Sequence, residues 1–405
     1  MSTKIKDVDF IIYGGGITAD IISIILDSEN KQYCIVEENA KKQLENSPRS
    51  LALSQSSMNL LTYYGISFPF QEINEMRVFE SGLDGKKSKG ELIFNNNEIL
   101  GYVVKYNDIQ KAILKKKKPQ KIKLRTLNVL NVEFNNLSLK VTMSDGNEIN
   151  ANNIIFTKKI NIDLLPKLNL SYRKKSYDQK AIVTTLQHKE GHEGIAYQYY
   201  DNGKPLALLP LKKSGVYYKT SLIWSLDDYL ADDILANDDL TSILNNKLGH
   251  LYKTIKIKDE PISFPLNKFL LRGKADNRLI FVGDSIRMMH PMAGQAWNQS
   301  LRDISYLADA LAESKNLGID LTSSPSLGLL KRLRKLEGEG MTNSIDFINY
   351  IYNLDTSLSK GIRRNLMKVM NSFKPINKLI INEANGGIIR RPSLLMGEKP
   401  GTRKV

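Results

Sequence analysis

Apolar and polar positions along the first forty residues predict a strand, a turn, a helix and a second strand. Residues 9–13 read DFIIY, a short apolar run, and residues 33–38 read YCIVEE. Between them, a GGGITA turn is followed by DIISIILDS, which has the pattern of a helix. The chain therefore begins with a predicted βαβ unit of about thirty residues.

The turn of this unit carries a glycine motif, in which Gly14, Gly16 and Ala19 form G-x-G-x-x-A. The first glycine permits a tight turn, the second lets the backbone approach a pyrophosphate, and the small third residue lets helix pack on strand. The unpaired N–H groups at the helix start would face the phosphates. Glu37 ends the second strand, where a carboxylate accepts ribose hydroxyls. These features predict a dinucleotide-binding unit.

The rest of the chain changes character twice. Residues 176–226 are rich in β-forming runs with turns between them, which predicts an antiparallel sheet inserted between segments of the dinucleotide-binding domain. Residues 325–390 have a helical pattern. Between these parts, the apolar run 279–282 ends in Gly-Asp, and a long amphipathic pattern follows a proline and a small-residue turn. An acidic residue at the end of a buried strand, Asp284, calls for a specific reason such as a bound ligand.

Composition and charge narrow the class of protein. Of the 405 residues, 41% are apolar and 25% are charged, as in ordinary soluble proteins. The net charge of +15 raises a nucleic-acid hypothesis. The lysines are scattered, however, and the densest run, at 115–123, has no interleaved aromatic residues for base stacking. We predict no nucleic-acid partner, while an anionic membrane surface stays compatible with the charge.

Cysteine and histidine usage indicates a reducing compartment and no metal. The single cysteine, Cys34, lies in an apolar run and is expected to be a buried thiol. His188 and His192 have no cysteine partners nearby, so no zinc site is predicted. The N-terminus lacks a signal-peptide pattern, and glycines interrupt the first apolar stretch. We expect a cytoplasmic protein, with peripheral attachment to the inner face of the membrane as a further expectation.

An ordered set of motifs resembles one family. The segments GGGITA, RSLALS, LGYVV, YDQKAIV, GKPLALLPL, RLIFVGDS and HPMAGQAWNQSLRD resemble the flavin-dependent aromatic hydroxylases, and among them the ubiquinone-biosynthesis hydroxylases. The resemblance implies an α/β fold with a Rossmann-like FAD-binding domain of the para-hydroxybenzoate hydroxylase type, an inserted antiparallel substrate sheet and C-terminal helices. The implied bounds are 1–70, 100–175 and 270–322 for the FAD-binding domain, 71–99 and 176–269 for the substrate-binding domain, and 323–405 for the C-terminal helical segment.

The resemblance also implies which residues bind FAD. The glycine motif would take the pyrophosphate, Glu37 the ribose and Asp284 the ribityl chain, with Arg49 near the cofactor. Pro291 would face the isoalloxazine, and backbone N–H groups at the next helix start would meet its N1/O2 edge. The complete predicted set is Gly14, Gly16, Ala19, Glu37, Arg49, Asp284, Pro291, Gly294, Ala296, Trp297 and Asn298. No catalytic side chain is expected.

The implied reaction is a ring hydroxylation. In such enzymes NAD(P)H reduces the flavin, which reacts with oxygen to give a C4a-hydroperoxide, and the terminal oxygen passes to an electron-rich ring. The implied substrate is a lipophilic polyprenyl phenol. A membrane surface and related quinone-synthesis subunits are the implied partners.

The chain departs from the family pattern at several positions. The Asp-Gly that usually follows the strand at 153–157 is replaced by Lys159 and Ile160, give or take one residue. Arg287 stands where the family has histidine, and Ala296 and Ser300 replace glycines.

Two interpretations follow from these departures. In one, the protein is an active hydroxylase whose cofactor contacts have changed. In the other, it is a catalytically degenerate scaffold or accessory subunit of a quinone-synthesis complex. Retention of HPMAGQ, Asp284, Glu37 and Arg49 favours the active enzyme.

Overall fold

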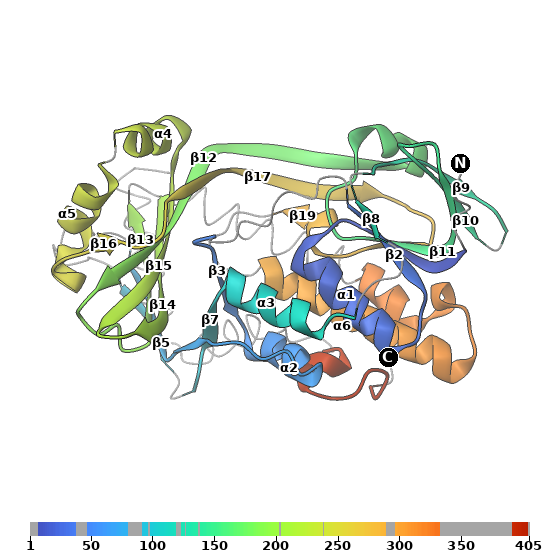
Figure 1. Ribbon diagram of the computed structural model, residues 1–405, viewed down its shortest axis with the longest axis horizontal. Coiled ribbons are helices and arrows are strands. Elements are labelled where there is room, and N and C mark those ends of the chain that lie inside the picture. Colours follow the sequence, from blue (N-terminus) through green and yellow to red (C-terminus); the bar gives the residue numbers. More distant parts are fainter. Residues whose placement is uncertain are drawn as a thin grey trace.

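A computed structural model of the chain shows three β-sheets with helices packed against them (Figure 1). The structure describes residues 7–37, 47–79, 91–95, 98–118, 123–125, 127–136, 138–201, 204–237, 239–288, 296–332 and 391–403.

The predicted βαβ unit is confirmed and forms the centre of the first sheet. β1 (Val8–Tyr13) is parallel to β2 (Tyr33–Glu37), and α1 (Gly16–Ser28) connects them. The strand order is β8-β2-β1-β11-β10-β9, and β18 pairs with β11. The other strands of this sheet are β8 (Lys123–Arg125), β9 (Val129–Phe134), β10 (Leu139–Met143), β11 (Glu148–Phe156) and β18 (Leu279–Phe281).

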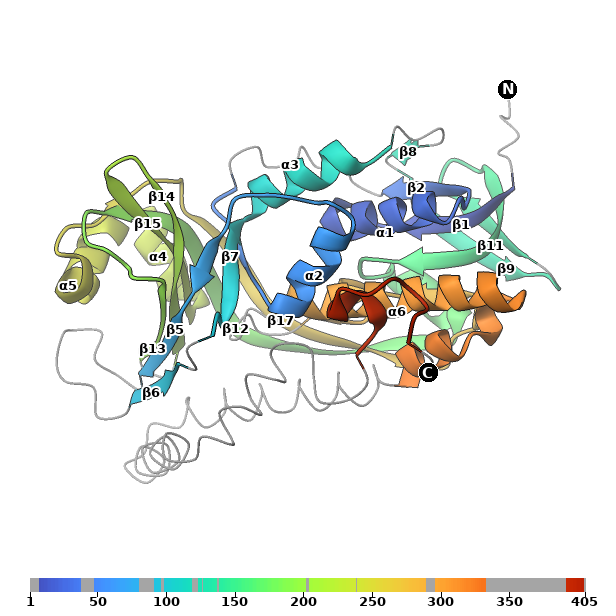
Figure 2. The same cartoon turned by 90° about the horizontal axis from the view of Figure 1, so that it is seen from below.

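Both faces of the first sheet are buried. Ile12 belongs to the core shared with the helices, whereas its neighbour Ile11 belongs to the core on the other face, beside Cys34. A strand that is buried on both faces reads as a continuous apolar run, which is why β1 shows no alternation. Burial raises the pKa of the Cys34 thiol to about 12. The helices that contribute to the first core are α1, α2 (Gln55–Tyr63), α3 (Tyr106–Lys116) and α6 (Ala296–Leu317) (Figure 2).

A small antiparallel sheet connects the first sheet to a larger one. β7 (Gly101–Lys105) lies between β3 (Ser50–Leu53) and β4 (Gln71–Ile73). Val103 of β7 packs with Leu211 of the larger sheet. The small sheet therefore holds the two larger sheets together.

The larger sheet has nine strands among the described residues and contains two long ones. β12 (Leu170–His188) and β17 (Ile262–Gly273) pair antiparallel and run across the molecule (Figure 1). The strand order is β19-β17-β12-β15-β14-β13-β5-β6, and β16 pairs with β12. The other strands are β5 (Glu75–Phe79), β6 (Glu91–Phe94), β13 (Ile195–Asp201), β14 (Lys204–Ser214), β15 (Tyr217–Asp227), β16 (Lys256–Ile257) and β19 (Arg287–Met288).

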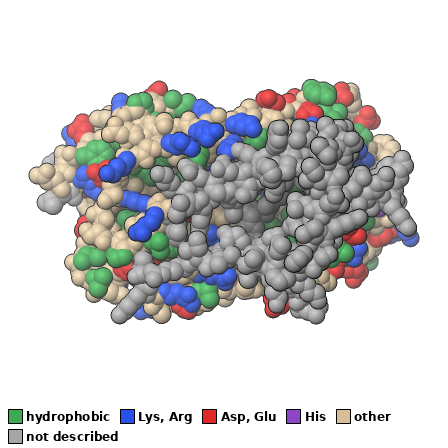
Figure 3. Space-filling model, turned by 180° about the vertical axis from the view of Figure 1, so that it is seen from behind, with side chains coloured by type: hydrophobic (Ala, Val, Ile, Leu, Met, Phe, Trp, Pro, Cys, Tyr) green, Lys and Arg blue, Asp and Glu red, His purple; other side chains and the backbone are tan. Residues whose placement is uncertain are grey.

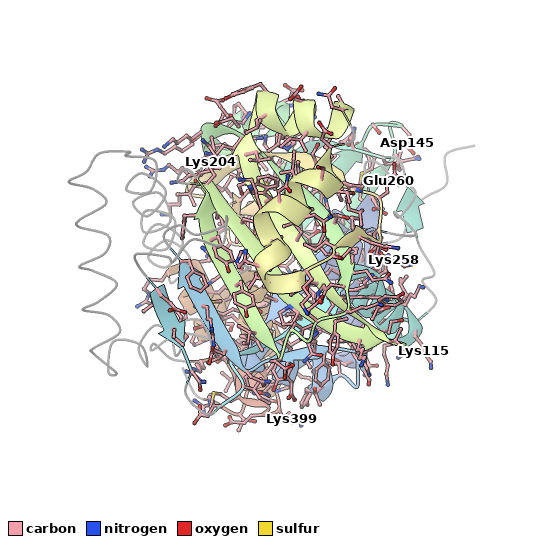
Figure 4. The ribbon with its side chains drawn as sticks, turned by 90° about the vertical axis from the view of Figure 1, so that its left-hand side faces the viewer. Lys115, Asp145, Lys204, Lys258, Glu260 and Lys399 are labelled. Atoms are coloured by element: carbon pink, nitrogen blue, oxygen red, sulfur yellow. The ribbon has the colours of Figure 1, made fainter. Side chains whose placement is uncertain are left out.

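One face of the nine-stranded sheet is covered by two helices. Ile182, Leu208 and Trp224 pack there with α4 (Asp228–Ala236) and α5 (Leu240–Tyr252) in one apolar core. Figure 4 looks onto these helices lying over the sheet. We call this the outer face.

The opposite face, here called the inner face, is turned towards the small sheet. Side chains alternate along a strand, so Val183 and Ile223, which follow or precede outer-face residues, lie on it. Ser221 of the same face accepts a hydrogen bond of 2.7 Å from the Ser50 hydroxyl of β3.

The structure confirms the predicted fold class, an α/β sheet unit combined with an antiparallel sheet. The predicted C-terminal helical segment falls mostly outside the described residues, which include a helix at 325–332 and the 3₁₀ turn η6 (Ser393–Met396). The turn packs on α2 and α6 (Figure 2). Within the described ranges, no helix is long and apolar enough to cross a membrane.

Candidate cofactor site

The glycine turn between β1 and α1 restricts side chains by its backbone angles and, at Gly14 and Gly15, by close neighbours. Gly14 and Gly16 have φ angles of +119° and +75°, a region that favours glycine. A Cβ atom on Gly14 would overlap the Thr157 hydroxyl. Ala19 is fully buried, so α1 packs closely on the sheet. The turn therefore presents its backbone, and none of its own side chains, to a ligand.

The N-cap residue of α1 supplies no capping side chain. This residue is Gly15, and the first turn of the helix contains no acidic residue. The Tyr106 hydroxyl contacts the backbone of Ile17 in the same turn. The first N–H groups of a helix lack intrahelical acceptors, and the helix dipole makes this end positive. A helix start of this kind beside a glycine turn is suited to a pyrophosphate.

Glu37 lies directly against the glycine turn. A Cβ atom on Gly15 would overlap the Glu37 carboxylate, so this carboxylate is in contact with the turn backbone. The side chain is half-buried. The structure thus brings the predicted ribose acceptor to the predicted pyrophosphate turn.

Arg49 lies just before β3 and reaches the nine-stranded sheet. Its guanidinium carbon is 5.4 Å from the centre of the Phe264 ring. The residue is exposed. Burial raises the pKa values of Tyr106 and Asp284, and the charge of Arg49 partly offsets this rise in both. Arg49 is therefore close to both the glycine turn and the end of β18.

Asp284 follows β18 in a setting that suits ligand binding. Its surface is accessible, yet the surrounding protein desolvates the carboxyl and raises its pKa, which Arg287 and Arg49 partly offset. This combination is expected for a side chain that lines a recess. None of the described residues donates a hydrogen bond to Asp284, so the carboxylate can accept one from a ligand.

The start of α6 is anchored by Asn298. Its Oδ1 accepts hydrogen bonds from Ser54 N (3.0 Å) and Ser57 Oγ (2.6 Å), and its Nδ2 donates to Ala52 O (2.9 Å). The Asn298 amide is thus occupied by protein partners, and the N–H groups of Ala296, Trp297 and Asn298 stay the predicted flavin contacts. The predicted residues Pro291 and Gly294 lie outside the described residues.

The two predicted glycine replacements near α6 have different surroundings. Ala296 is exposed, so its methyl group is not packed against the protein. Ser300 is buried, and its hydroxyl donates to Ala296 O at 3.2 Å. Gly283, at a φ of +59°, fits against Ser300 only because it has no Cβ.

A buried polar cluster behind Asp284 was not anticipated from the sequence. The Arg287 side chain is 5% exposed and donates from Nη2 to Gln299 Oε1 at 3.1 Å. The same nitrogen is 3.6 Å from Asp303 Oδ2, which accepts from Gly283 N at 2.9 Å. Gln299 and Asp303 are one helical turn apart on α6, so both lie on one face of the helix. This spacing is the feature of the sequence from which the cluster could have been predicted.

Lys158 and Lys159, the two lysines that follow β11, have different surroundings. The Lys159 ammonium is 5.5 Å from the centre of the Tyr172 ring and 5.7 Å from that of Phe269. Desolvation and the charge of Lys174 lower the pKa of Lys159. The residue beside Gly14 is Lys158.

The buried histidines of the nine-stranded sheet are occupied by protein partners. His188 contacts Glu190 O at 2.8 Å and Thr220 Oγ1 at 2.9 Å. His192 contacts Leu211 O at 3.0 Å. Burial lowers the pKa of both rings. These contacts fit the predicted packing role.

The residues of the site fit FAD. The glycine turn is a cradle that a Cβ atom on Gly14 would fill, and the N-cap residue of α1 has no capping side chain. The Asp284 carboxylate accepts no hydrogen bond from the described residues. The start of α6 is held by a side chain that leaves its backbone available. The chemistry of these residues is compatible with a flavin dinucleotide.

Comparisons with known proteins agree with this geometry. Residues 157–316 match the family described as FAD binding domain. The chain is 24% identical over 409 residues to ubiquinone hydroxylase UbiL of Rhodospirillum rubrum, covering 98% of this chain and 92% of that protein. It is 23% identical to the mitochondrial ubiquinone biosynthesis monooxygenase COQ6 of Dictyostelium discoideum, covering 93% and 91%. Among solved structures, p-nitrophenol 4-monooxygenase PnpA of Pseudomonas putida superposes with a TM-score of 0.75 at 13% identity, covering 99% and 100%.

The fold and the site define a flavoprotein with an FAD-binding domain of the para-hydroxybenzoate hydroxylase type. Within that class, the chain is similar along nearly its whole length to proteins named as ubiquinone hydroxylases and monooxygenases. The family resemblance predicted from the motifs is thereby confirmed.

Proposed function

We propose that the protein is a monooxygenase that hydroxylates the aromatic ring of a polyprenylated phenol in ubiquinone biosynthesis. Similarity to two proteins named for that pathway, along nearly the whole chain, supports the assignment. The observation that carries the substrate class is the uncharged centre of the inner face.

Small and apolar side chains form the centre of the inner face. Ala181 and Val183 of β12 lie opposite Ser225 and Ile223 of β15, and Ala207 of β14 lies on the other side of Ile223. Ile223 and Ala207 remain partly accessible. These side chains carry no charge, so an ionised carboxylate placed against them would lose its hydration without gaining an ion pair from the wall itself. The wall therefore favours a lipophilic phenol over an aromatic acid.

Phe264 links this wall to the cofactor site. It lies opposite Ala181 across β17 and β12, and its ring contacts the Arg49 guanidinium. Arg49 is within electrostatic range of Asp284. A ring bound on the inner face would therefore lie next to the cofactor, as hydroxylation requires.

Each part of the site has a proposed role. When bound, FAD would supply reducing equivalents taken from NAD(P)H and the activation of molecular oxygen. The Gly14–Gly16 turn and the α1 start would hold the pyrophosphate, Glu37 the ribose and Asp284 a ribityl hydroxyl. N–H groups at the α6 start would stabilise negative charge on the flavin ring. The protein orients the substrate and excludes water, and no side-chain nucleophile is required.

A lipophilic substrate implies exchange with a membrane. Peripheral attachment at the inner face of the membrane is part of the proposal, and the net charge of +15 supports it because anionic lipids attract basic proteins. Figure 3 shows Lys and Arg side chains spread over the back of the molecule. Association with related quinone-synthesis subunits is proposed from the shared pathway.

A degenerate scaffold or accessory subunit is the second candidate. The replacement of an Asp-Gly by Lys159 and Ile160 after β11 favours it. The position of Lys159 over two aromatic rings weakens the objection to an active enzyme, because its charge is held at Tyr172 and Phe269. A subunit that has lost its cofactor would bind no FAD, which separates the two candidates.

The FAD-loaded protein, given NAD(P)H and oxygen, should convert a prenylated phenol to a product heavier by one oxygen atom, detected by mass spectrometry. Ala207→Lys should lower kcat/KM for this substrate by at least about tenfold, because an ammonium would be desolvated against the ring. Flavin content should not change. Ser242→Lys, at an exposed position on α5, is the matched control and should have no effect. Turnover of a charged aromatic acid with no product from the prenylated phenol would contradict the substrate class.

A further inference from the structure

The end of β11 lies beside the glycine turn because β11 is parallel to β1. Phe156 is the register partner of Tyr13, and Thr157 N donates to Tyr13 O at 2.9 Å. The residues that follow these two strands therefore emerge at the same edge of the sheet. They are Gly14 on one strand and Lys158 on the other.

The Lys158 side chain rests on the glycine turn. A Cβ atom built on Gly14 would lie 3.1 Å from Lys158 Cγ and 3.2 Å from Lys158 N. The ammonium lies 5.0 Å from the centre of the Tyr13 ring, and the side chain is half-buried. The lysine stem thus packs against the backbone of the turn, and the ammonium, three bonds beyond Cγ, stays close to the turn.

Lys159 differs in this respect, although it is the next residue. Its ammonium lies over Tyr172 and Phe269, on β12 and β17. The two lysines thus form a natural pair for comparison, with equal charge and adjacent positions but different surroundings.

We propose that Lys158 supplies a cationic contact to the pyrophosphate of the bound FAD. The glycine turn and the α1 start are where a dinucleotide pyrophosphate binds, and a lysine whose stem lies against that turn brings a complementary charge to it. This inference rests on FAD binding at the site.

Lys158→Met should raise the dissociation constant for FAD about tenfold, the effect of one charge-assisted contact, measured by flavin fluorescence in the apoprotein. The rise of this constant with salt concentration should also be shallower than in the parent protein. Lys158→Arg should retain most of the affinity. Lys159→Met is the matched control and should bind FAD as the parent does. Riboflavin, which has no phosphate, should bind both methionine variants with the same affinity as the parent protein.

An unchanged FAD dissociation constant in Lys158→Met would overturn the proposal, as would an equal loss of riboflavin affinity. An effect confined to the concentration of NAD(P)H that half-saturates flavin reduction would also overturn it, because the pyrophosphate would then be that of the nicotinamide dinucleotide. If the parent protein binds no FAD, the proposed function itself fails, and this outcome is distinct from the other three. Unchanged circular dichroism excludes misfolding of the variants.

Discussion

Replacing Asp284 with alanine should leave a folded protein that no longer retains FAD. The carboxylate accepts no hydrogen bond from the described residues, so its removal takes little from the fold. A hydrogen bond to an ionised group contributes about 1.5–3 kcal/mol. The dissociation constant for FAD should therefore rise roughly ten- to a hundredfold, measured by fluorescence titration and by the flavin-to-protein ratio after gel filtration.

Asp145→Ala is the matched control for this variant. Asp145 is an exposed acid in the turn between β10 and β11, at the periphery of the molecule (Figure 4). It should leave the flavin ratio unchanged. Parent-like flavin content in Asp284→Ala would show that the carboxylate does not contact the cofactor.

Arg287→Met should cost the protein about 3 kcal/mol of unfolding free energy, because it leaves the buried Asp303 carboxylate without its guanidinium. Gln299 loses a hydrogen-bond donor as well. The same change removes the main charge that lowers the pKa of Asp284. Urea unfolding followed by circular dichroism measures the loss.

The exposed ion pair between Arg403 and Glu398 is the control for the buried Arg287 cluster. Their side chains are 44% and 36% exposed, and an ion pair of this kind contributes at most about 1 kcal/mol. Arg403→Met should therefore unfold close to the parent. Equal unfolding midpoints for Arg287→Met and the parent would mean that the buried cluster does not stabilise the fold.

The first βαβ unit could be predicted because its signals are local. The apolar run of β1, the glycines that need positive φ angles, and Glu37 at the end of β2 all lie within one short segment. Asp284 was predictable for the same reason, since an acid directly after a buried strand is visible without knowing the fold.

The cluster around Arg287 could not be predicted, because its partners depend on how α6 packs against β19. Gln299 is 12 positions away in sequence, and nothing in the apolar pattern fixes that distance in space. The directions in which the Lys158 and Lys159 side chains point could not be predicted either. A shift of one residue in the register of a strand exchanges the faces on which its side chains lie.

The first half of β12 was also invisible to pattern analysis. The strand begins at Leu170, whereas the apolar pattern begins near residue 180. Most side chains at 171–178 are exposed, so they show no alternation of apolar and polar residues. That part of the strand is defined by its pairing with β17 and not by a periodic pattern of burial.

The most direct test of the central claim is the visible spectrum of the protein after incubation with FAD and removal of the excess, recorded before and after addition of NAD(P)H. An FAD-dependent monooxygenase should show the absorbance bands of bound oxidised flavin, and NAD(P)H should bleach them. A protein that carries no flavin after this treatment would contradict the account and leave the scaffold as the better description.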